Sequence, residues 1–388
     1  MPVSQNNLAI YIHWPFCLSK CPYCDFNSHV RERIDQEIWA DSLLRELDYF
    51  RGLSGKRTVG SVFFGGGTPS LMSPDVVARL LDRISRNWQC DEGIEITLEA
   101  NPTSVEAGKF RDFAAAGVNR LSLGVQALNN RDLKALGREH DVKEARDAIA
   151  LSQKYFPRTS FDLIYARMGQ TLAEWRQELM EAFSLAGGHL SLYQLTVEKG
   201  TAFYQAHSKG RLVLPDEEAS ADMFDLTQDL CVAHGLPAYE ISNHARAGQQ
   251  SRHNLAYWTY ADYIGVGPGA HGRLTLDDGR LYAFCQHRSP EKWLDNIALQ
   301  GHATDQKSCL APREMAEEMI MMGLRLAQGI DLVNFENRIG EKIEKFIDSV
   351  YLQRLFELDY MEMVDHHLRA TARGVPLLNG LLYRILQS

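Results

Sequence analysis

The fold is decided by the stretch Tyr11-Ile12-His13-Trp14-Pro15-Phe16-Cys17-Leu18-Ser19-Lys20-Cys21-Pro22-Tyr23-Cys24, which holds three of the seven cysteines of the chain. Their spacing is C-x3-C-x2-C, and the next cysteine along the chain is Cys90. A closed zinc site or an ordinary iron–sulfur carrier uses four protein ligands. Three thiolates on a four-iron cluster would leave one iron open to another molecule. Two alternatives stay open, namely a zinc site completed by His13 or His29, and three unrelated buried thiols.

The composition is that of an ordinary globular protein, with 45% apolar and 23% charged residues. A length of 388 residues fits one large domain and a smaller one. The net charge of −9 and the lack of a basic stripe argue against a nucleic-acid partner. No stretch approaches the roughly 20 apolar residues that span a bilayer, and the first residues do not resemble a secretory signal. Seven cysteines, three of them clustered, do not suggest a disulfide framework, so we expect a reducing, cytoplasmic protein.

Short apolar runs alternate with amphipathic segments up to about residue 198, which predicts parallel strands joined by helices. The predicted strands are Leu8–His13, Ser61–Phe64, Ile94–Glu99, Arg120–Gly124, Thr159–Ile164 and His189–Thr196. The predicted helices are Asp35–Tyr49, Pro74–Asn87, Ser104–Ala116, Val142–Gln153, Leu172–Leu185 and Pro215–His234. Six such units cannot close an eightfold barrel, so we expect an α/β fold with an open, partial (β/α)6 barrel and its chemistry at the C-terminal strand ends. A doubly wound open sheet would place the motifs at the same edge and stays the alternative.

This alternation of strand-like and helical segments ends after residue 198, and we expect the chain to form three regions. Residues 1–235 would form the barrel, and residues 236–305, rich in Gly, His and aromatic residues, an irregular segment near the site. The pattern of residues 306–388 predicts a small winged-helix-like α+β domain. Its helices are expected over Pro312–Ala327, Asp331–Ile339 and Lys345–Leu358, before a hairpin over Met361–Leu382 that turns near Arg373.

A run of three glycines, Gly65-Gly66-Gly67-Thr68-Pro69-Ser70, follows the second predicted strand. Glycines let a backbone approach a ligand closely and adopt a positive φ. Peptide groups there could therefore hold the ammonium and carboxylate of an amino acid. The run lacks the Lys-Ser/Thr pair of a phosphate loop, and a plain turn is the alternative.

Polar residues stand near the ends of the next strands and inside the cysteine loop. Glu99 ends the third strand, where a carboxylate can accept hydrogen bonds from ribose hydroxyls, and Gln126 ends the fourth. Arg138 could bind a carboxylate with its planar fork. Asp162 is an acid within an apolar strand, where Asp is rare unless paired, so Arg138 and Asp162 could instead satisfy each other. Tyr23, in the cysteine loop, could shield one face of a cluster or of an adenine.

Two histidines have surroundings that suggest a ligand. His253 lies in Ser251-Arg252-His253-Asn254-Leu255-Ala256-Tyr257-Trp258. An imidazole can bind haem iron, and aromatic side chains can line a macrocycle. The alternative is that His253 packs with Trp258 in the core. His271 follows a glycine-rich loop and could be a second polar contact there.

Together these motifs resemble the HemW family of radical S-adenosylmethionine (SAM) proteins, haem chaperones related to oxygen-independent coproporphyrinogen III dehydrogenase. The most specific pieces are Tyr11-Ile12-His13-x-Pro15-Phe16-Cys17, Gly65-Gly66-Gly67-Thr68-Pro69-Ser70, Gly117-Val118-Asn119-Arg120-Leu121-Ser122-x-Gly124-Val125-Gln126 and Tyr239-Glu240-Ile241-Ser242-Asn243. The resemblance implies a 4Fe-4S cluster on the three clustered cysteines, with SAM on the open iron. It implies contacts to SAM at Tyr11, Gly67, Thr68, Glu99, Gln126, Arg138 and Asp162.

Two features of the resemblance separate the chaperones from the dehydrogenases. The dehydrogenases carry a long N-terminal arm and an extra cysteine two residues past the third, whereas here sixteen residues precede Cys17 and position 26 is Phe26. The pattern His253-Asn254-x-x-Tyr257-Trp258 is similar to one associated with haem binding in the chaperones. The chain departs from the family at Tyr165-Ala166-Arg167-Met168-Gly169-Gln170, where many relatives have Gly-Leu-Pro-Gly, so we expect a different loop after the fifth strand.

The resemblance leads to two hypotheses of function. The first is a haem-binding protein that delivers haem to an acceptor protein, with the cluster and SAM in support. Its further partner would be an electron donor for the cluster, and any membrane association would be peripheral and through the acceptor. The second is an oxygen-independent coproporphyrinogen III dehydrogenase, in which SAM is cleaved reductively and the porphyrin precursor is decarboxylated. DNA binding by the C-terminal domain is a third hypothesis, which the net charge disfavours.

Overall fold

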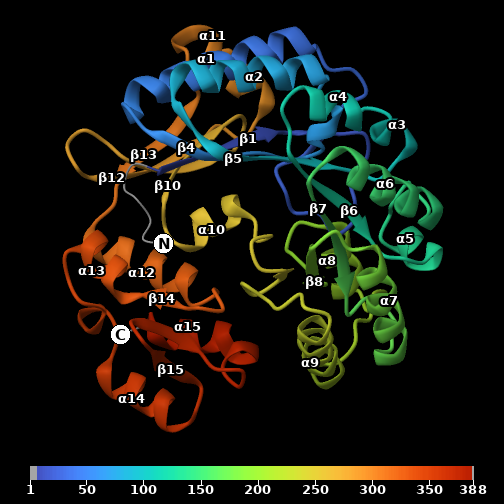
Figure 1. The fold of residues 1–388 in the computed structure, drawn as a ribbon, viewed down its shortest axis with the longest axis vertical. Helices are drawn as coiled ribbons and strands as arrows, with labels where there is room; N and C mark the ends of the chain where they lie inside the picture. The colour runs from blue at the N-terminus through green and yellow to red at the C-terminus, as the bar shows by residue number, and fades with distance from the viewer. Residues whose placement is uncertain (1–6, 387–388) are drawn as a thin grey trace.

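One curved sheet of 11 strands dominates the computed structural model, which describes residues 7–386 (Figure 1). Six parallel strands at its centre lie side by side in chain order, and they confirm the six predicted strands. They are β1 (Asn7–Trp14), β4 (Thr58–Gly66), β5 (Gln89–Ala100), β6 (Arg120–Gln126), β7 (Arg158–Tyr165) and β8 (His189–Gln194). The order of these six strands never reverses, whereas a doubly wound sheet reverses at a switch point. The fold is therefore the partial barrel.

Helices cover the outer face of this sheet (Figure 1). The main ones are α1 (Gln36–Ser54), α2 (Pro74–Asn87), α4 (Phe110–Ala115), α6 (Val142–Tyr155), α7 (Leu172–Leu185) and α9 (Glu217–Ala233). Their beginnings follow from local chemistry. Ser73 accepts a hydrogen bond from the backbone of Val76 at the start of α2, and Thr171 forms a capping box with Glu174 at the start of α7. The predicted helix over residues 104–116 is broken into α3 (Ser104–Ala107) and α4, with Gly108 as the C-cap of α3.

The expectation that residues 236–305 are irregular is wrong. The segment contains β9 (Asn243–Ala245), α10 (Arg252–Trp258), β10 (Asp262–Val266), β11 (His271–Thr275), β12 (Leu281–Gln286) and α11 (Pro290–Gln300). It extends the sheet at both edges, because β9 pairs with β8 and β10 pairs in parallel with β1. These strands are hard to predict from the sequence because they are short. In addition, β10 contains Gly265, which is required there for steric reasons. A Cβ at Gly265 would lie 2.1 Å from the carbonyl oxygen of His271. The boundaries at residues 235 and 305 stay a prediction.

The C-terminal region has a small core of its own. Its elements are β13 (Thr304–Cys309), α12 (Pro312–Gly323), β14 (Ile330–Asp331), α13 (Leu332–Ile339), α14 (Ser349–Glu357), β15 (Met361–Val364), β16 (His367–Ala370) and α15 (Leu378–Ile385). The strands β14, β16 and β15 form a separate sheet, whereas β13 belongs to the edge of the large one. The three predicted helices are present, but the predicted turn is wrong. The β15–β16 hairpin turns at Asp365, whose φ of 52° is one that Asp tolerates better than most residues, and Arg373 leads into α15 instead.

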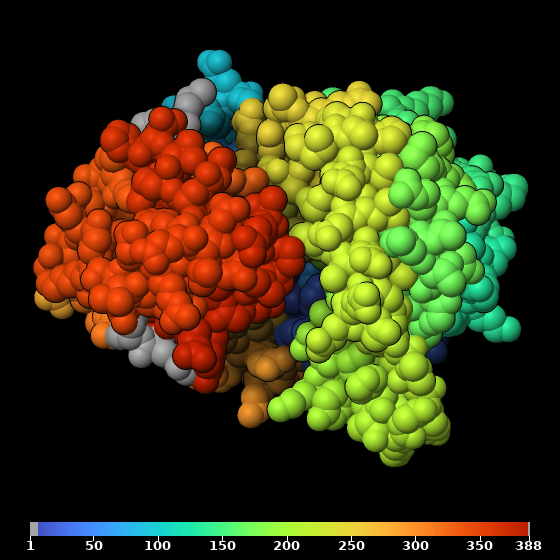
Figure 2. All heavy atoms as spheres, turned by 90° about the horizontal axis from the view of Figure 1, so that it is seen from below, coloured from blue at the N-terminus to red at the C-terminus, as the bar shows by residue number. Residues whose placement is uncertain are grey.

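Ion pairs, one around the buried Asp262 and one half-buried, hold this C-terminal region against the sheet. Asp262 of β10 is bound by Arg338 of α13 and, at 3.2 Å, by Arg57. Arg273 of β11 pairs with Glu318 of α12 at 2.6 Å. Seen from below, the C-terminal region and the segment around residues 200–260 flank a hollow in which the N-terminal segment is visible (Figure 2).

The loop after β7, where the chain departs from its family, is built around a buried arginine. Arg167 is 2% exposed and donates to Asp132 and to Glu178, at 2.6 Å in each case. It also donates to the carbonyl of Ile164 at 2.6 Å. A charge network thus fixes this loop in place of the proline-containing turn that the resemblance implies.

We expect Arg167→Met to lower the free energy of unfolding by about 3–5 kcal/mol, because it leaves Glu178 buried without a cation and leaves Asp132 with only the exposed Arg131. Urea unfolding followed by circular dichroism measures the change. The matched control is Arg131→Met, because Arg131 also bonds Asp132 but is 63% exposed, and its loss should cost less than about 1 kcal/mol. Equal losses in the two variants would contradict a structural role for the buried network.

Candidate functional site

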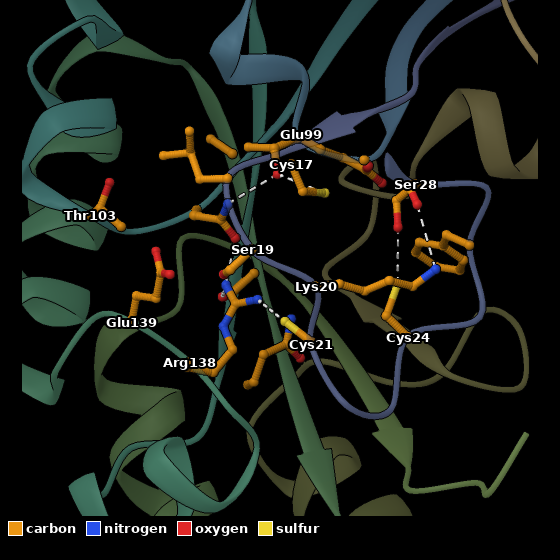
Figure 3. A pocket seen from close by; sticks show the side chains of 18 of the residues that line it. Cys17, Ser19, Lys20, Cys21, Cys24, Ser28, Glu99, Thr103, Arg138 and Glu139 are labelled. Carbon is orange, nitrogen blue, oxygen red and sulfur yellow. Dashed lines mark hydrogen bonds between the residues drawn. The ribbon is translucent and has the colours of Figure 1, made fainter. Parts of the chain in front are cut away.

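The three clustered cysteines line one pocket at the C-terminal ends of the parallel strands (Figure 3). Their loop begins at β2 (Phe16–Cys17) and ends at β3 (His29–Val30), and these two short strands pair with each other. The same pocket is lined by seven other residues that the sequence singled out: Tyr23, Gly67, Thr68, Glu99, Gln126, Arg138 and Asp162. Tyr11 and His253 are not among the lining residues.

Polar groups surround each cysteine sulfur. Thr68 donates its hydroxyl to the Cys17 sulfur at 3.3 Å, and Arg138 donates to the Cys21 sulfur at 3.4 Å. The Cys24 sulfur lies 4.0 Å from the hydroxyl of Ser28 (Figure 3). Burial raises the pKa of the Cys17 and Cys24 thiols, whereas donors aimed at the sulfurs favour thiolates. Hydrogen bonds of this kind also tune iron–sulfur clusters.

A single zinc ion does not fit this pocket. Within residues 7–386, no three His, Cys, Asp or Glu side chains converge on one ion. His13, one of the two candidate fourth ligands, is occupied, because its Nε2 contacts the carbonyl oxygen of Asn27 at 2.9 Å and its Nδ1 contacts the Tyr11 hydroxyl at 3.1 Å. Burial lowers the pKa of His13 to about 4. Thiols spread around a cavity suit a multi-iron cluster, in which each thiolate binds a different iron.

The glycine run passes directly behind the cysteine loop. The N–H of Gly67 donates to the carbonyl of Trp14 at 2.7 Å, and that of Thr68 donates to Phe16 at 2.8 Å. A Cβ at Gly67 would lie 2.6 Å from the carbonyl oxygen of Phe16. Glycine is thus required for this contact, which holds the run against the loop and leaves Gly67 and Thr68 on the pocket wall.

Two half-buried acidic residues, Glu99 and Asp162, line the pocket. Burial, reinforced by Asp162, raises the pKa of Glu99 to about 8. Burial also raises the pKa of Asp162 to about 6. Gly66 donates its N–H to Glu99 at 3.3 Å. Buried carboxyls that lack enough donors are costly, so a ligand that brings several hydroxyl or ammonium donors would be stabilised here.

Arg138 and Asp162 do not form a direct pair in this structure. Arg138 donates to Asn101 at 2.5 Å and to the carbonyl of Gly124 at 2.7 Å, besides its bond to Cys21. Its Nε is buried and has no hydrogen-bond partner among the described residues. An unpaired buried donor beside two carboxyls fits a ligand with both a carboxylate and an ammonium group, as SAM has. Sequence analysis missed Asn101, although its place two residues after Glu99 at a strand end was a usable signal.

His253 lies behind the pocket as a core histidine, so the haem-ligand interpretation of His253 does not fit this structure. It is 1% exposed, its Nδ1 contacts the hydroxyl of Ser61 at 3.0 Å, and its Nε2 contacts that of Tyr257 at 2.7 Å. Burial lowers its pKa to about 3. Its ring stacks on Phe63, with centroids 4.9 Å apart, and Tyr11 stacks on the same Phe63. A haem iron would have to displace one of these two hydroxyls inside the barrel.

Comparison with known proteins gives the class of this one. Residues 11–182 match the Radical SAM superfamily, and residues 310–377 match the HemN C-terminal domain. The coproporphyrinogen III oxidase HemN of Escherichia coli, described as a radical SAM enzyme, shares the fold with a TM-score of 0.81, covering 98% of this chain and 90% of that one at 20% identity. The chain is a radical SAM protein with a HemN-type C-terminal domain, and this class binds a 4Fe-4S cluster and SAM.

More similar relatives define the family. The chain is 37% identical to "Heme chaperone HemW" of Escherichia coli over 384 residues, which cover 97% of each chain. It is 36% identical to the mitochondrial "Radical S-adenosyl methionine domain-containing protein 1" of Danio rerio over 392 residues, or 100% of this chain and 88% of the relative. The chain belongs to the family that these two proteins represent. Among residues 7–386, no helix has the length and apolarity to cross a membrane.

We expect Cys17→Ser, Cys21→Ser and Cys24→Ser each to abolish the visible absorbance of the cluster and to lower bound iron sharply after anaerobic reconstitution, since each thiolate would hold a different iron. Cys309→Ser is the matched control, because Cys309 is exposed and lies outside the pocket. Loss of iron in the control, or retention of the cluster in any of the three, would contradict the assignment of ligands.

Glu99 predicts a pH dependence of stability in the SAM-free protein. Its folded pKa of about 8 lies above the roughly 4.3 of an unfolded Glu, so the folded state keeps a proton that the unfolded state loses. Stability should therefore fall as the pH rises from about 4 to about 8. Thermal unfolding across this range should show a smaller decrease in Glu99→Gln, whereas Glu139→Gln, at an exposed pocket position, should match the unaltered protein. Parallel profiles for all three proteins would refute a buried protonated Glu99.

Proposed function

We propose that this protein binds haem and delivers it to an acceptor protein, with the cluster and SAM in a supporting role. The observation that carries the proposal is an apolar rim on the cysteine loop. Leu18, Phe26 and Val30 are large apolar side chains that stand exposed there, and Phe26 is 61% exposed. An exposed aromatic group beside a pocket suits a flat apolar ligand such as a macrocycle. The relatives called "Heme chaperone HemW" support the same function.

Phe26 also bears on the choice between the two hypotheses. It occupies the position at which the resemblance places an extra cysteine in the dehydrogenases. A phenyl ring cannot ligate iron, transfer a proton or form a thiyl radical, so any reaction step that used this cysteine is lost. The same ring adds apolar surface for a bound macrocycle.

In this proposal the residues of the pocket hold the cofactors and do not react with haem. Cys17, Cys21 and Cys24 would bind the cluster, which with SAM supplies one-electron chemistry when both are bound. Glu99 and Asp162 would accept hydrogen bonds from SAM, and Arg138 would donate its free Nε–H.

The second candidate function is oxygen-independent coproporphyrinogen III dehydrogenase. The pocket favours it, because its lining includes the three clustered cysteines and six of the seven residues that the resemblance implies as SAM contacts. The fold shared with HemN is compatible with both functions, because a likeness at 20% identity shows the fold alone. Under either function the cluster needs an electron donor. The relatives' names include mitochondrial and bacterial proteins, so a cytoplasmic location stays a prediction, as does an acceptor protein that carries any contact with a membrane.

One anaerobic experiment separates the two functions. The reconstituted protein is titrated with haem, and in parallel it is incubated with coproporphyrinogen III, SAM and a reductant while protoporphyrinogen is measured. We expect a haem dissociation constant of about 1 µM or tighter and no decarboxylation. HemN of Escherichia coli is the positive control for turnover. Turnover comparable to that of HemN, together with no haem binding, would replace the chaperone proposal by the dehydrogenase.

A further inference from the structure

The side chain of Arg120 is a buried cation that forms no ion pair within residues 7–386. It is 3% exposed, and its guanidinium also donates no hydrogen bond to the described residues. An unpaired charge away from water raises the free energy of a folded protein. A guanidinium does not lose its proton in proteins, so Arg120 cannot avoid this cost by becoming neutral. Its position in the barrel indicates which groups can compensate the charge.

Arg120 lies inside the barrel, beneath the cluster pocket. Side chains alternate along a strand, and Leu121, Leu123 and Val125 of β6 belong to the main hydrophobic core. Arg120 and Ser122 are therefore on the opposite face of β6, which faces the barrel interior. Ser122 lines the pocket, whereas Arg120, two residues earlier on the same face, does not. Arg120 thus lies one step deeper in the barrel than the pocket wall.

The two acidic residues of the pocket lie on the strands beside Arg120. The strand β6 pairs with β5, which carries Glu99, and with β7, which carries Asp162. Glu99 lies opposite Ser122, two residues along the same face from Arg120. Burial raises the pKa of Glu99 to about 8 and that of Asp162 to about 6, and the charge of Arg120 opposes both increases. Arg120 is therefore close enough to favour the ionised form of both carboxyls.

Three uncharged side chains also lie near Arg120, namely His189, His253 and Tyr239. Burial, to which Arg120 adds, lowers the pKa of His253 to about 3 and that of His189 well below its usual value. Both imidazoles are therefore neutral at pH 7. Burial raises the pKa of Tyr239, so its phenol keeps its proton. None of these three side chains can compensate the charge of Arg120.

Further titratable or charged side chains face Glu99 or Asp162 from other parts of the barrel: Tyr11, Arg138, Tyr193 and Tyr257. The three tyrosines are neutral at pH 7, because desolvation inside the barrel and nearby acidic groups raise the pKa of each. Arg138 favours the ionised form of Asp162. The two carboxyls therefore face two guanidiniums, that of Arg138 on the pocket wall and that of Arg120 beneath it, and these four charges can balance.

We propose that Arg120 is a positioning residue of the SAM site, whose buried charge allows Glu99 and Asp162 to be ionised together when SAM is bound. SAM carries a sulfonium, an ammonium and a carboxylate group, and its donors bind ionised carboxylates more strongly than protonated ones. Arg120 acts through the two carboxyls and does not touch SAM. This inference rests on SAM binding and on the proposed contacts of Glu99 and Asp162 to SAM, and it is independent of haem delivery.

The test is the pH dependence of SAM binding to the cluster-loaded protein, measured anaerobically by calorimetry. In the unaltered protein the affinity should increase as the pH rises towards about 8, because Glu99 must lose its proton before it binds SAM. We expect Arg120→Met to raise the pKa of both carboxyls further. Its SAM affinity should be about tenfold lower at pH 7, for a shift of about one pKa unit, and should approach that of the unaltered protein at higher pH.

Two further measurements separate this effect from a structural one. Titrations in buffers with different enthalpies of ionisation count the protons that SAM binding releases, and Arg120→Met should release more at pH 7 than the unaltered protein does. Arg120→Lys keeps the positive charge, so its SAM affinity and pH profile should stay close to those of the unaltered protein.

The matched control is Arg158→Met. Arg158 lies opposite Arg120 on β7, but it is paired with Glu95 and donates to the carbonyl of Gln250 at 2.6 Å. Its loss should lower the thermal stability and leave the pH profile of SAM binding unshifted. Arg120→Met breaks no hydrogen bond or ion pair among the described residues, so it should lose less stability than Arg158→Met.

Three results would overturn the role of Arg120. They are an unchanged pH profile in Arg120→Met, an equal loss of SAM affinity at every pH, and a variant that does not fold, since the last two would make Arg120 a direct contact or a structural residue. Absence of SAM binding in the unaltered protein would instead refute the SAM site itself.

Discussion

The rest of the site depends on how the cysteine loop is fixed to the end of β1. Backbone hydrogen bonds from Gly67 and Thr68 reach back to Trp14 and Phe16, and they are formed only because Gly67 has no side chain to collide with Phe16. On the other side, Asn27 ties the loop to the carbonyls of Pro268 and Arg288. A loop held from both sides keeps three thiols at set positions around one cavity, and this geometry is what leaves a fourth position for a ligand from outside.

The electrostatics of the pocket follow from its depth. The pKa values of Glu99 and Asp162 are raised because the barrel removes water from their carboxyl groups. Arg138 donates to sulfur and carbonyl acceptors, and its Nε–H has no hydrogen-bond partner among the described residues. The protein thus maintains two carboxyls and one cation that protein partners do not fully satisfy. Polar groups left without partners raise the free energy of the ligand-free protein, so a zwitterionic ligand that supplies the missing partners is stabilised in this site.

The cysteine loop brings polar and apolar groups to one pocket. Its three cysteines line the pocket, and so do the exposed side chains of Leu18 and Phe26. Under the proposed function, one short segment would therefore serve both the cofactors and an apolar cargo. His253 lies in a motif rich in aromatic residues, and its stacking on Phe63 and its contact with Ser61 hold α10 against β4.

The sequence by itself determined the local features. The six parallel strands, the cap of α2 at Ser73, the three thiols and the polar strand ends depend on short-range patterns, and parallel topology brings strand ends together whatever the loops do. Tertiary structure alone decided the rest. The strands β9 and β10 are defined by their pairing with β8 and β1, which lie far away in the sequence. The burial of His253 is set by its packing against β4. Arg167 shows the same limit, since its carboxylate partners are 35 and 11 residues away. Burial and long-range contacts set the protonation and availability of a side chain, and no local pattern contains that information.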